Sequence, residues 1–167
     1  MDLVAFYAGT EADYQGRRLE EMLGWDDEKL EAVHDFIQVL FPLRVPSGVN
    51  PHAPLLTDET VAAFGRDEKL RNNLRRAWER MLRFYGLEWQ RGRVVRRVEF
   101  EERARVWLRK GNHNHLRITR ILSALSILGL RAEAAGFLAA LEEIVREWPT
   151  KVTPETVTYW RGALEAR

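Results

Sequence analysis

Side chains that can bind anions stand close together between residues 112 and 120, in the stretch NHNHLRITR. On a helix of about 100° per residue, His113, Arg117 and Arg120 fall on one face. Asn112 or Asn114 can cap such a helix, and the unpaired backbone N–H groups at its start attract anions. Guanidinium groups bind carboxylates through paired hydrogen bonds. The spacing therefore predicts a site for a small anion or a peptide carboxylate.

The two arginines have a second interpretation as internal ion pairs. An unpaired guanidinium on a mostly buried helix is costly, so each needs a partner. Glu31 and Asp35, in the acidic segment beside His34, are the carboxylates that we expect to serve inside the protein. The sequence leaves both interpretations of Arg117 and Arg120 open.

The histidines give a third interpretation, a metal site. The chain has no cysteine, so the only plausible ligands are His34, His52, His113 and His115. The His-Asn-His spacing directs its two imidazoles to different sides of a helix, which suits a single metal ion poorly. We therefore predict neither a metal site nor a cofactor.

Two polar residues of the acidic segment, His34 and Gln38, stand four positions apart and so share one face of a helix. They form either the wall of a polar pocket or a hydrogen-bond network that fixes helix packing.

Catalytic motifs are absent from the sequence, which has no glycine-rich phosphate loop, nucleophile elbow or zinc-protease spacing. A histidine beside an acid, such as His34 before Asp35, could do acid–base chemistry, but sequence adjacency is not evidence of that geometry. We predict a protein that is not an enzyme.

Positive charge is concentrated between residues 66 and 110, where there are fifteen basic and seven acidic residues. Guanidinium groups along one helix face, followed by the segment QRGRVVRR, can follow the phosphates of a nucleic acid. The residues of this alternative site are Arg71, Arg75, Arg76, Arg80, Arg83, Arg91 and Arg93. Acidic residues interrupt the patch and the net charge is only +1, so a solvated arginine-rich surface is the simpler interpretation.

Helical periodicity runs through nearly the whole chain. It predicts helices over residues 16–23, 26–41, 57–64, 67–85, 99–110, 115–128, 132–148 and 153–166. The segment 115–128 is apolar on almost every side and is predicted to be the central helix. A small β-hairpin is predicted to turn near Gly92. The predicted fold class is all-α, a single domain over residues 1–167 with about seven or eight helices around the central one.

Composition and segment lengths limit the class of protein. A content of 46% hydrophobic and 31% charged residues is typical of a globular domain. No apolar run is long enough to span a membrane, and the N-terminus lacks the basic region of a signal peptide. We expect a cytoplasmic protein that does not insert into membranes. A loop at residues 42–56 holds four of the six prolines and is expected to dock through Val45, Val49, Leu55 and Leu56.

Several of these segments together resemble one known family. HDFIQVLFPL, NPHAPLLT, MLRFYGL and NHNHLRITRILSALSILGL, in that order, are similar to the conserved region of the opioid growth factor receptor family. The resemblance covers about residues 3 to 145, and Val39 stands where the family usually has tryptophan. It implies an all-helical domain. In animals it implies a protein that binds methionine enkephalin, is associated with the nucleus and restrains cell growth.

The resemblance carries no agreed ligand-contacting residues, but polar positions of the shared motifs match residues of this chain. The predicted ligand site consists of His34, Gln38, Asn50, His113, Asn114, Arg117 and Arg120. We predict a non-enzymatic module that binds a peptide or a small anionic ligand. Nucleic-acid binding through the basic face and a role as a protein–protein adaptor are the alternatives.

Overall fold

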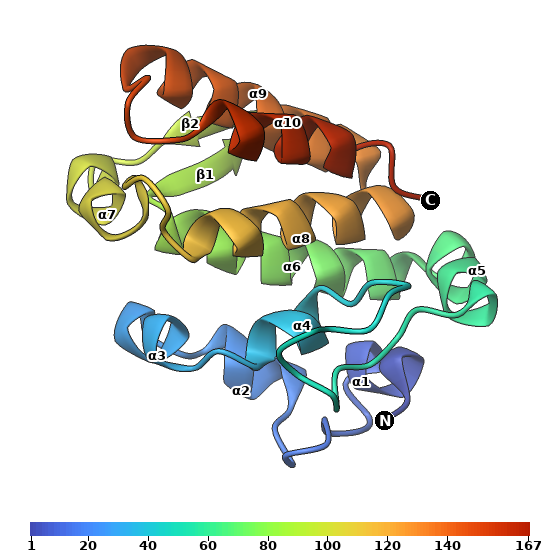
Figure 1. Ribbon diagram of the computed structural model, residues 1–167. Helices are drawn as coiled ribbons and strands as arrows, with labels where there is room; N and C mark the ends of the chain where they lie inside the picture. Colours follow the sequence, from blue (N-terminus) through green and yellow to red (C-terminus); the bar gives the residue numbers. More distant parts are fainter. The chain divides into compact units, whose positions relative to one another are not determined.

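The computed structural model describes residues 1–167, which form two compact units, Met1–Trp78 and Glu79–Arg167. Ten helices and one two-stranded hairpin confirm the predicted all-α class with a small hairpin (Figure 1). The single domain stays a prediction. None of the helices combines the length and apolar character that crossing a membrane requires.

The first unit contains five short helices and the beginning of a longer one. Their bounds are α1 Leu3–Ala8, α2 Leu19–Leu23, α3 Asp27–Ala32, α4 Phe36–Leu40, α5 Asp58–Arg66 and α6 Glu68–Phe84, the last of which continues into the second unit. Side-chain oxygens start three of them, because Asp2, Asp26 and Thr57 each accept from a backbone N–H of the first turn. The helix α1 was not predicted.

The prediction of one helix over residues 26–41 is wrong. The chain leaves helical geometry at Val33, where ψ is 128°, and α4 begins at Phe36. The carboxylate of Asp35 does not cap α4 but bonds to side chains of the 13–17 segment. These tertiary contacts outweigh the local helix propensity, which is a weak determinant. The break and the unpredicted α1 together raise the number of helices to ten.

The proline-rich loop is held at its ends. The N–H of Leu56 donates to the carbonyl of Leu43 at 3.0 Å, and Leu56 is buried. Val45, Val49 and Leu55 are instead 63%, 85% and 44% exposed, so the prediction that they dock is wrong. Asn50, near the middle of the loop, is buried and ties this part of the chain down.

The second unit is built around one apolar helix. Its remaining elements are β1 Leu87–Gln90, β2 Arg93–Arg96, α7 Phe100–Trp107, α8 Asn114–Ile127, α9 Arg131–Glu147 and α10 Pro154–Ala163. Figure 1 shows α10 running alongside α8 and α9, and both α9 and α10 pack against α8. Ile118, Ile121 and Leu125 of α8 are completely buried, which confirms that this helix belongs to the core.

The hairpin packs against α9 through a tryptophan that stands over a glycine. A Cβ atom on Gly136 would lie 2.7 Å from the ring of Trp89. We expect Gly136→Ala to lower the free energy of unfolding by about 1–3 kcal/mol, because the bulky ring must shift within a packed contact. Urea unfolding of the variant measures the loss. Gly162→Ala is the matched control, since its Cβ would meet nothing within 4 Å. An equal loss in both would contradict the close contact.

Candidate functional site

The turn before α8 is held by Asn112, the first residue of the NHNH motif. The side-chain oxygen of Asn112 accepts from the backbone N–H of Asn114 at 3.0 Å and from its side-chain nitrogen at 3.1 Å. The amide nitrogen of Asn112 donates to the carbonyl of Val106 at 2.9 Å. The predicted asparagine cap is wrong, because the N-cap position of α8 is His113, which makes no side-chain capping bond; Asn112 instead joins the turn before α8 to the end of α7.

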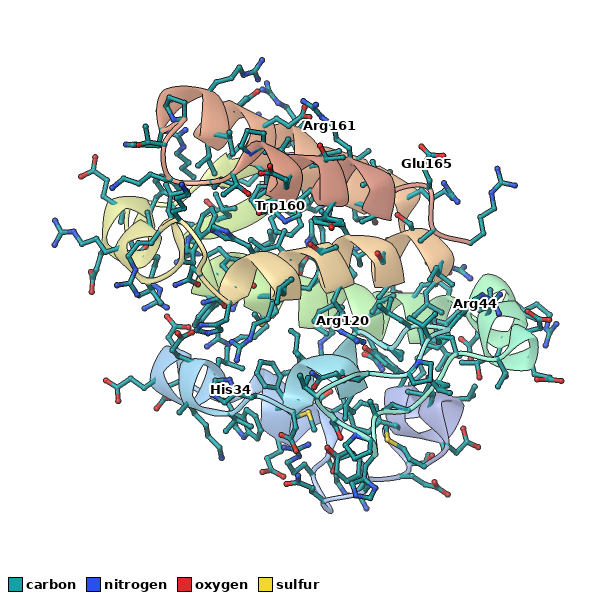
Figure 2. The ribbon with its side chains drawn as sticks, viewed as in Figure 1. His34, Arg44, Arg120, Trp160, Arg161 and Glu165 are labelled. Carbon is teal, nitrogen blue, oxygen red and sulfur yellow. The ribbon has the colours of Figure 1, made fainter.

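His115 connects several helices of the second unit. Its Nε2 lies 3.0 Å from the carbonyl oxygen of Trp107, and its own carbonyl accepts from the indole of Trp160 at 3.1 Å. Figure 2 places Trp160 on the side of α10 that is turned toward α8. The indole of Trp107 in turn donates to the carbonyl of Tyr85 at 3.0 Å. The second histidine of the motif thus has a structural role.

The predicted anion-binding residues of α8 lie at its first two turns. Asn114 is completely buried and Arg117 is 5% exposed, with its Nη1 at 3.4 Å from the side-chain oxygen of Asn114. His113 is exposed, and its Nε2 lies 3.4 Å from the same asparagine. Burial lowers the pKa of the Arg120 guanidinium. The structure brings His113, Asn114 and Arg117 together. That they bind a ligand stays a prediction.

Burial also lowers the pKa of His115 below its ordinary value of 6.5, against the raising effect of its bond to Trp107. The unfolded chain therefore takes up a proton as the pH falls below about 6.5, whereas the folded chain resists protonation. We expect the free energy of unfolding to be greatest above that pH. Below that pH, protonation linked to His115 lowers the free energy of unfolding by at most about 1.4 kcal/mol per pH unit.

Urea unfolding between about pH 7.5 and pH 5 measures this dependence, to which buried neutral histidines contribute. The variant His115→Gln should flatten the curve over this range. His113→Gln is the matched control, because burial is the main cause of the lowered pKa of His115 and the charge of the exposed His113 a lesser one, so its loss should change the slope less. A slope that follows His113 instead would contradict the assignment.

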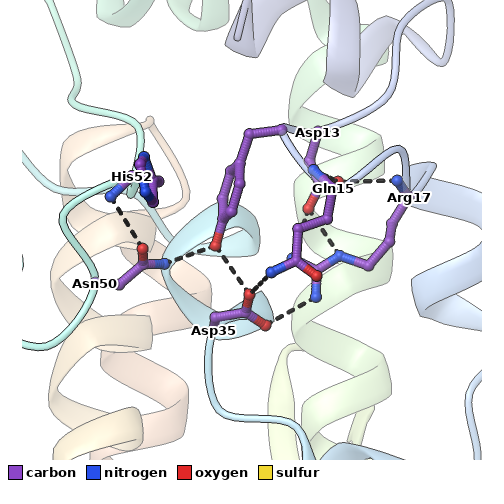
Figure 3. Close-up of polar contacts among 7 residues, drawn as sticks. Asp13, Gln15, Arg17, Asp35, Asn50 and His52 are labelled. Atoms are coloured by element: carbon purple, nitrogen blue, oxygen red, sulfur yellow. Dashed lines mark hydrogen bonds and ion pairs between the residues drawn. The ribbon is translucent and has the colours of Figure 1, made fainter.

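A polar cluster organises the first unit around Asp35 (Figure 3). Its carboxylate accepts from the hydroxyl of Tyr14 at 2.9 Å, from Nη1 of Arg17 at 2.8 Å, and from the side-chain nitrogen of Gln15. Burial opposes ionisation of Asp35, but the hydrogen bonds from Arg17 and Tyr14 outweigh it and lower the pKa of Asp35. Asp35 thus pairs with Arg17 of its own unit, and the predicted pairing of Glu31 and Asp35 with Arg117 and Arg120 stays a prediction.

Asn50 belongs to the same cluster. Its side-chain nitrogen donates to the hydroxyl of Tyr14 at 2.9 Å, and its oxygen accepts from the N–H of His52 at 3.0 Å (Figure 3). The rings of Tyr14 and His52 lie 5.7 Å apart. Burial raises the pKa of Tyr14. These contacts show that Asn50 fixes the proline-rich loop to the segment before α2.

His34 and Gln38 do not share a helical face, because the chain is not helical at His34. His34 is exposed, whereas Gln38 is 6% exposed within α4. With its amide oriented to satisfy both polar atoms, Gln38 donates to the carbonyls of His34 and Asp35 at 3.2 and 2.9 Å. Of the two interpretations of this pair, the geometry favours a local network that stabilises the break before α4.

Three of the arginines predicted for nucleic acid make contacts within the first unit. Arg71 donates to two backbone carbonyls of α5 at 2.5 and 2.9 Å, and Arg76 forms two hydrogen bonds with Glu20 at 2.6 and 2.8 Å. Arg75 donates to a neighbouring asparagine. The others, Arg80, Arg83, Arg91 and Arg93, belong to the second unit. A nucleic acid would have to compete with these contacts.

A groove of about 440 Å³ lies on the second unit between α7 and the turn that follows α9. Its apolar lining comes from Phe100 and Ala104, which share one side of α7, from Leu108 directly after that helix, and from Trp148. The volume is within the range of roughly 300–1,000 Å³ for ligand pockets. The sequence did not identify this groove, although the spacing of the α7 residues carries part of its pattern.

Arg96 contacts both aromatic rings of the groove and is itself fixed by an ion pair. The guanidinium of Arg96 lies 4.8 Å from the ring centroid of Phe100 and 5.0 Å from that of Trp148. It also forms two hydrogen bonds with Glu147, at 3.0 and 2.6 Å, which lower the pKa of Glu147. Cations placed near ring faces are attracted to them. The aromatic part of the groove is therefore positioned before any ligand arrives.

Comparison with known proteins agrees with the resemblance of the motifs. The family model described as the opioid growth factor receptor conserved region matches residues 4–167. The opioid growth factor receptor of Mus musculus is 39% identical over 160 residues, covering 91% of this chain and 25% of that protein. The receptor of Homo sapiens is 38% identical over 157 residues, covering 89% and 23%.

A second group of relatives shows the same partial coverage. Opioid growth factor receptor-like protein 1 of Rattus norvegicus is 40% identical over 119 residues, covering 68% of this chain and 25% of that protein. The chain thus spans about a quarter of the length of the curated relatives that it matches. No solved structure matches it. The match to the family model extends over nearly the whole chain, and the chain belongs to the opioid growth factor receptor family.

Proposed function

We propose that this chain is a non-enzymatic receptor domain that binds a peptide in the groove between α7 and the turn after α9. Family membership supports a receptor role, because the named relatives are receptors for a growth factor. The observation that carries the choice of site is the preformed pair of Phe100 and Trp148 at the groove. Aromatic side chains in defined pockets supply much of the binding energy of protein interfaces.

The geometry of this pair suits an apolar peptide side chain. The ring centroids of Phe100 and Trp148 are 5.9 Å apart at 44°, and Phe100 is buried whereas Trp148 is half-buried. A ligand can therefore cover Trp148 without unfolding the site. The predicted α8 residues lie deeper in the fold, since Asn114 and Arg117 are both buried, so a peptide reaches the groove more readily.

Replacement of Trp148 by alanine is expected to weaken peptide binding by about 30-fold, because this change removes the ring that a ligand would cover. Isothermal titration calorimetry with methionine enkephalin, and with longer peptides of mixed composition, measures the effect. Tyr159→Ala is the matched control, since Tyr159 is 68% exposed on α10 and does not line the groove. Its affinity should equal that of the wild type.

Two results would contradict the proposal. The first is peptide binding that Trp148→Ala leaves unchanged, above all if Arg117→Ala abolishes it in a folded protein, because the site would then lie at α8. The second is binding of DNA or RNA alone, with an affinity that falls steeply as salt is added, which would favour the arginine-rich face.

A further inference from the structure

We propose that the groove selects an acidic peptide segment, in which an apolar side chain contacts Phe100 and Trp148 while neighbouring carboxylates bind the cations at the rim. This inference rests on the proposed function and names the chemical class of its ligand. The rim is formed by Arg105, Arg109 and Lys151, with Glu101 as the one acidic residue that lines the groove.

None of the three rim cations has a carboxylate partner. Arg105, Arg109 and Lys151 are all exposed, and none forms an ion pair, not even with Glu101. Arg96 and Arg161, by contrast, each lie 2.6 Å from a carboxylate oxygen of α9. Three unpaired cations around an apolar groove produce a positive potential that an acidic ligand would satisfy.

The positive surface extends beyond the groove. A second cavity of about 280 Å³ is lined by Lys110 and Glu155 together with the residues before α10. It continues from the groove through the sequence neighbours Arg109–Lys110 and Lys151–Val152. The two cavities together contain four cations and two acids. A peptide that crosses both would therefore meet a net positive surface over its length, which favours acidic residues flanking an apolar one.

The position of the rim cations beside the apolar lining suits a peptide better than a free anion. Arg105 and Arg109 follow Ala104 and Leu108 directly in the chain, so the cations border the apolar side of α7. A phosphate or acetate ion could satisfy only the cations. A ligand that carries both apolar and carboxylate groups can satisfy the rings and the rim together, and its gain should exceed that of either group alone.

Fluorescence anisotropy tests this selection with two labelled peptides. The first has phenylalanine and leucine flanked on both sides by glutamates, and the second has glutamines in place of the glutamates. We expect the acidic peptide to bind about tenfold more tightly at low salt, from a few ion pairs each contributing a small factor. The difference should shrink as salt is added, because exposed charges are screened.

Charge reversal at the rim tests whether these cations cause the preference for the acidic peptide. The double variant Arg105→Glu/Arg109→Glu should weaken the acidic peptide by about tenfold or more and change the glutamine peptide little. If the double variant fails to fold, Lys151→Glu provides a second test, because Lys151 lies outside any helix. It should also weaken binding of the acidic peptide. Arg91→Glu, at the tip of the hairpin, is the matched control and should leave both peptides unaffected.

The outcomes separate this inference from the proposed function. Equal affinity for the two peptides, lost in Trp148→Ala, would keep the peptide site and overturn its selection of acidic ligands. An equal loss in Arg91→Glu would show a general charge effect and overturn the inference. Binding of neither peptide, tested up to millimolar concentration, would overturn both proposals.

Discussion

Gly86→Ala is expected to lower the free energy of unfolding by about 3 kcal/mol, the largest effect of any single methyl group that the structure indicates. Gly86 ends α6 with φ at +80°, a conformation that side chains rarely adopt. A Cβ atom there would also lie 2.7 Å from the Cα atom of Phe100, in the backbone of α7. The backbone of α7 cannot move aside as a side chain can. The variant therefore loses stability both from the unfavourable φ and from the steric clash.

Gly92→Ala isolates the conformational part of this cost. Gly92 turns the hairpin with φ at +79°, but a Cβ atom there would meet nothing within 4 Å. We expect Gly92→Ala to lower the free energy of unfolding by only about 1 kcal/mol. Urea unfolding followed by circular dichroism compares the two variants. Equal losses would contradict the close approach of α6 and α7 at Gly86.

Arg17→Met is expected to lower the free energy of unfolding by about 3–5 kcal/mol, the usual result when a buried ion pair loses one partner. Arg17 donates to Asp13 through Nε at 2.8 Å and Nη2 at 2.6 Å. The side chain of Asp13 is completely buried and that of Arg17 is 10% exposed. Methionine would fill similar space but leave the carboxylate of Asp13 without its cation.

Arg76→Met provides the matched control in the same unit. Arg76 also binds a carboxylate through two hydrogen bonds, but it is 47% exposed and its partner Glu20 is 66% exposed. An exposed ion pair contributes less than about 1 kcal/mol. Thermal and urea unfolding of both variants measure the contrast. A loss in Arg76→Met as large as that in Arg17→Met would show that burial is not the cause.

Local patterns predicted much of the fold. The apolar periodicity of 115–128 and the threonine cap of α10 depend on neighbouring residues alone, and the structure confirms both. The hairpin at Gly92 follows in the same way from a short turn between two segments with strand-forming residues. For such elements, the residues that determine the structure lie within one or two helical turns.

The break before α4 and the groove could not be predicted in this way. The break depends on Arg17 and Tyr14, which bond to Asp35 from a separate segment of the chain. The groove depends on Trp148 lying beside Phe100, a pairing that no periodicity within either helix encodes. The polar motif at the start of α8 predicted a ligand site, but its residues Asn112 and His115 form hydrogen bonds within the second unit.

The most direct test of the central claim is a titration of the ¹⁵N-labelled chain with the acidic peptide, followed by two-dimensional NMR. The account predicts saturable shifts for the amides of residues 100–109 and 148–153. It also predicts a shift of the Trp148 indole, which is assigned among the six tryptophans with a Trp148→Phe variant. Saturable shifts confined to residues 112–120, with the groove signals unchanged, would contradict it.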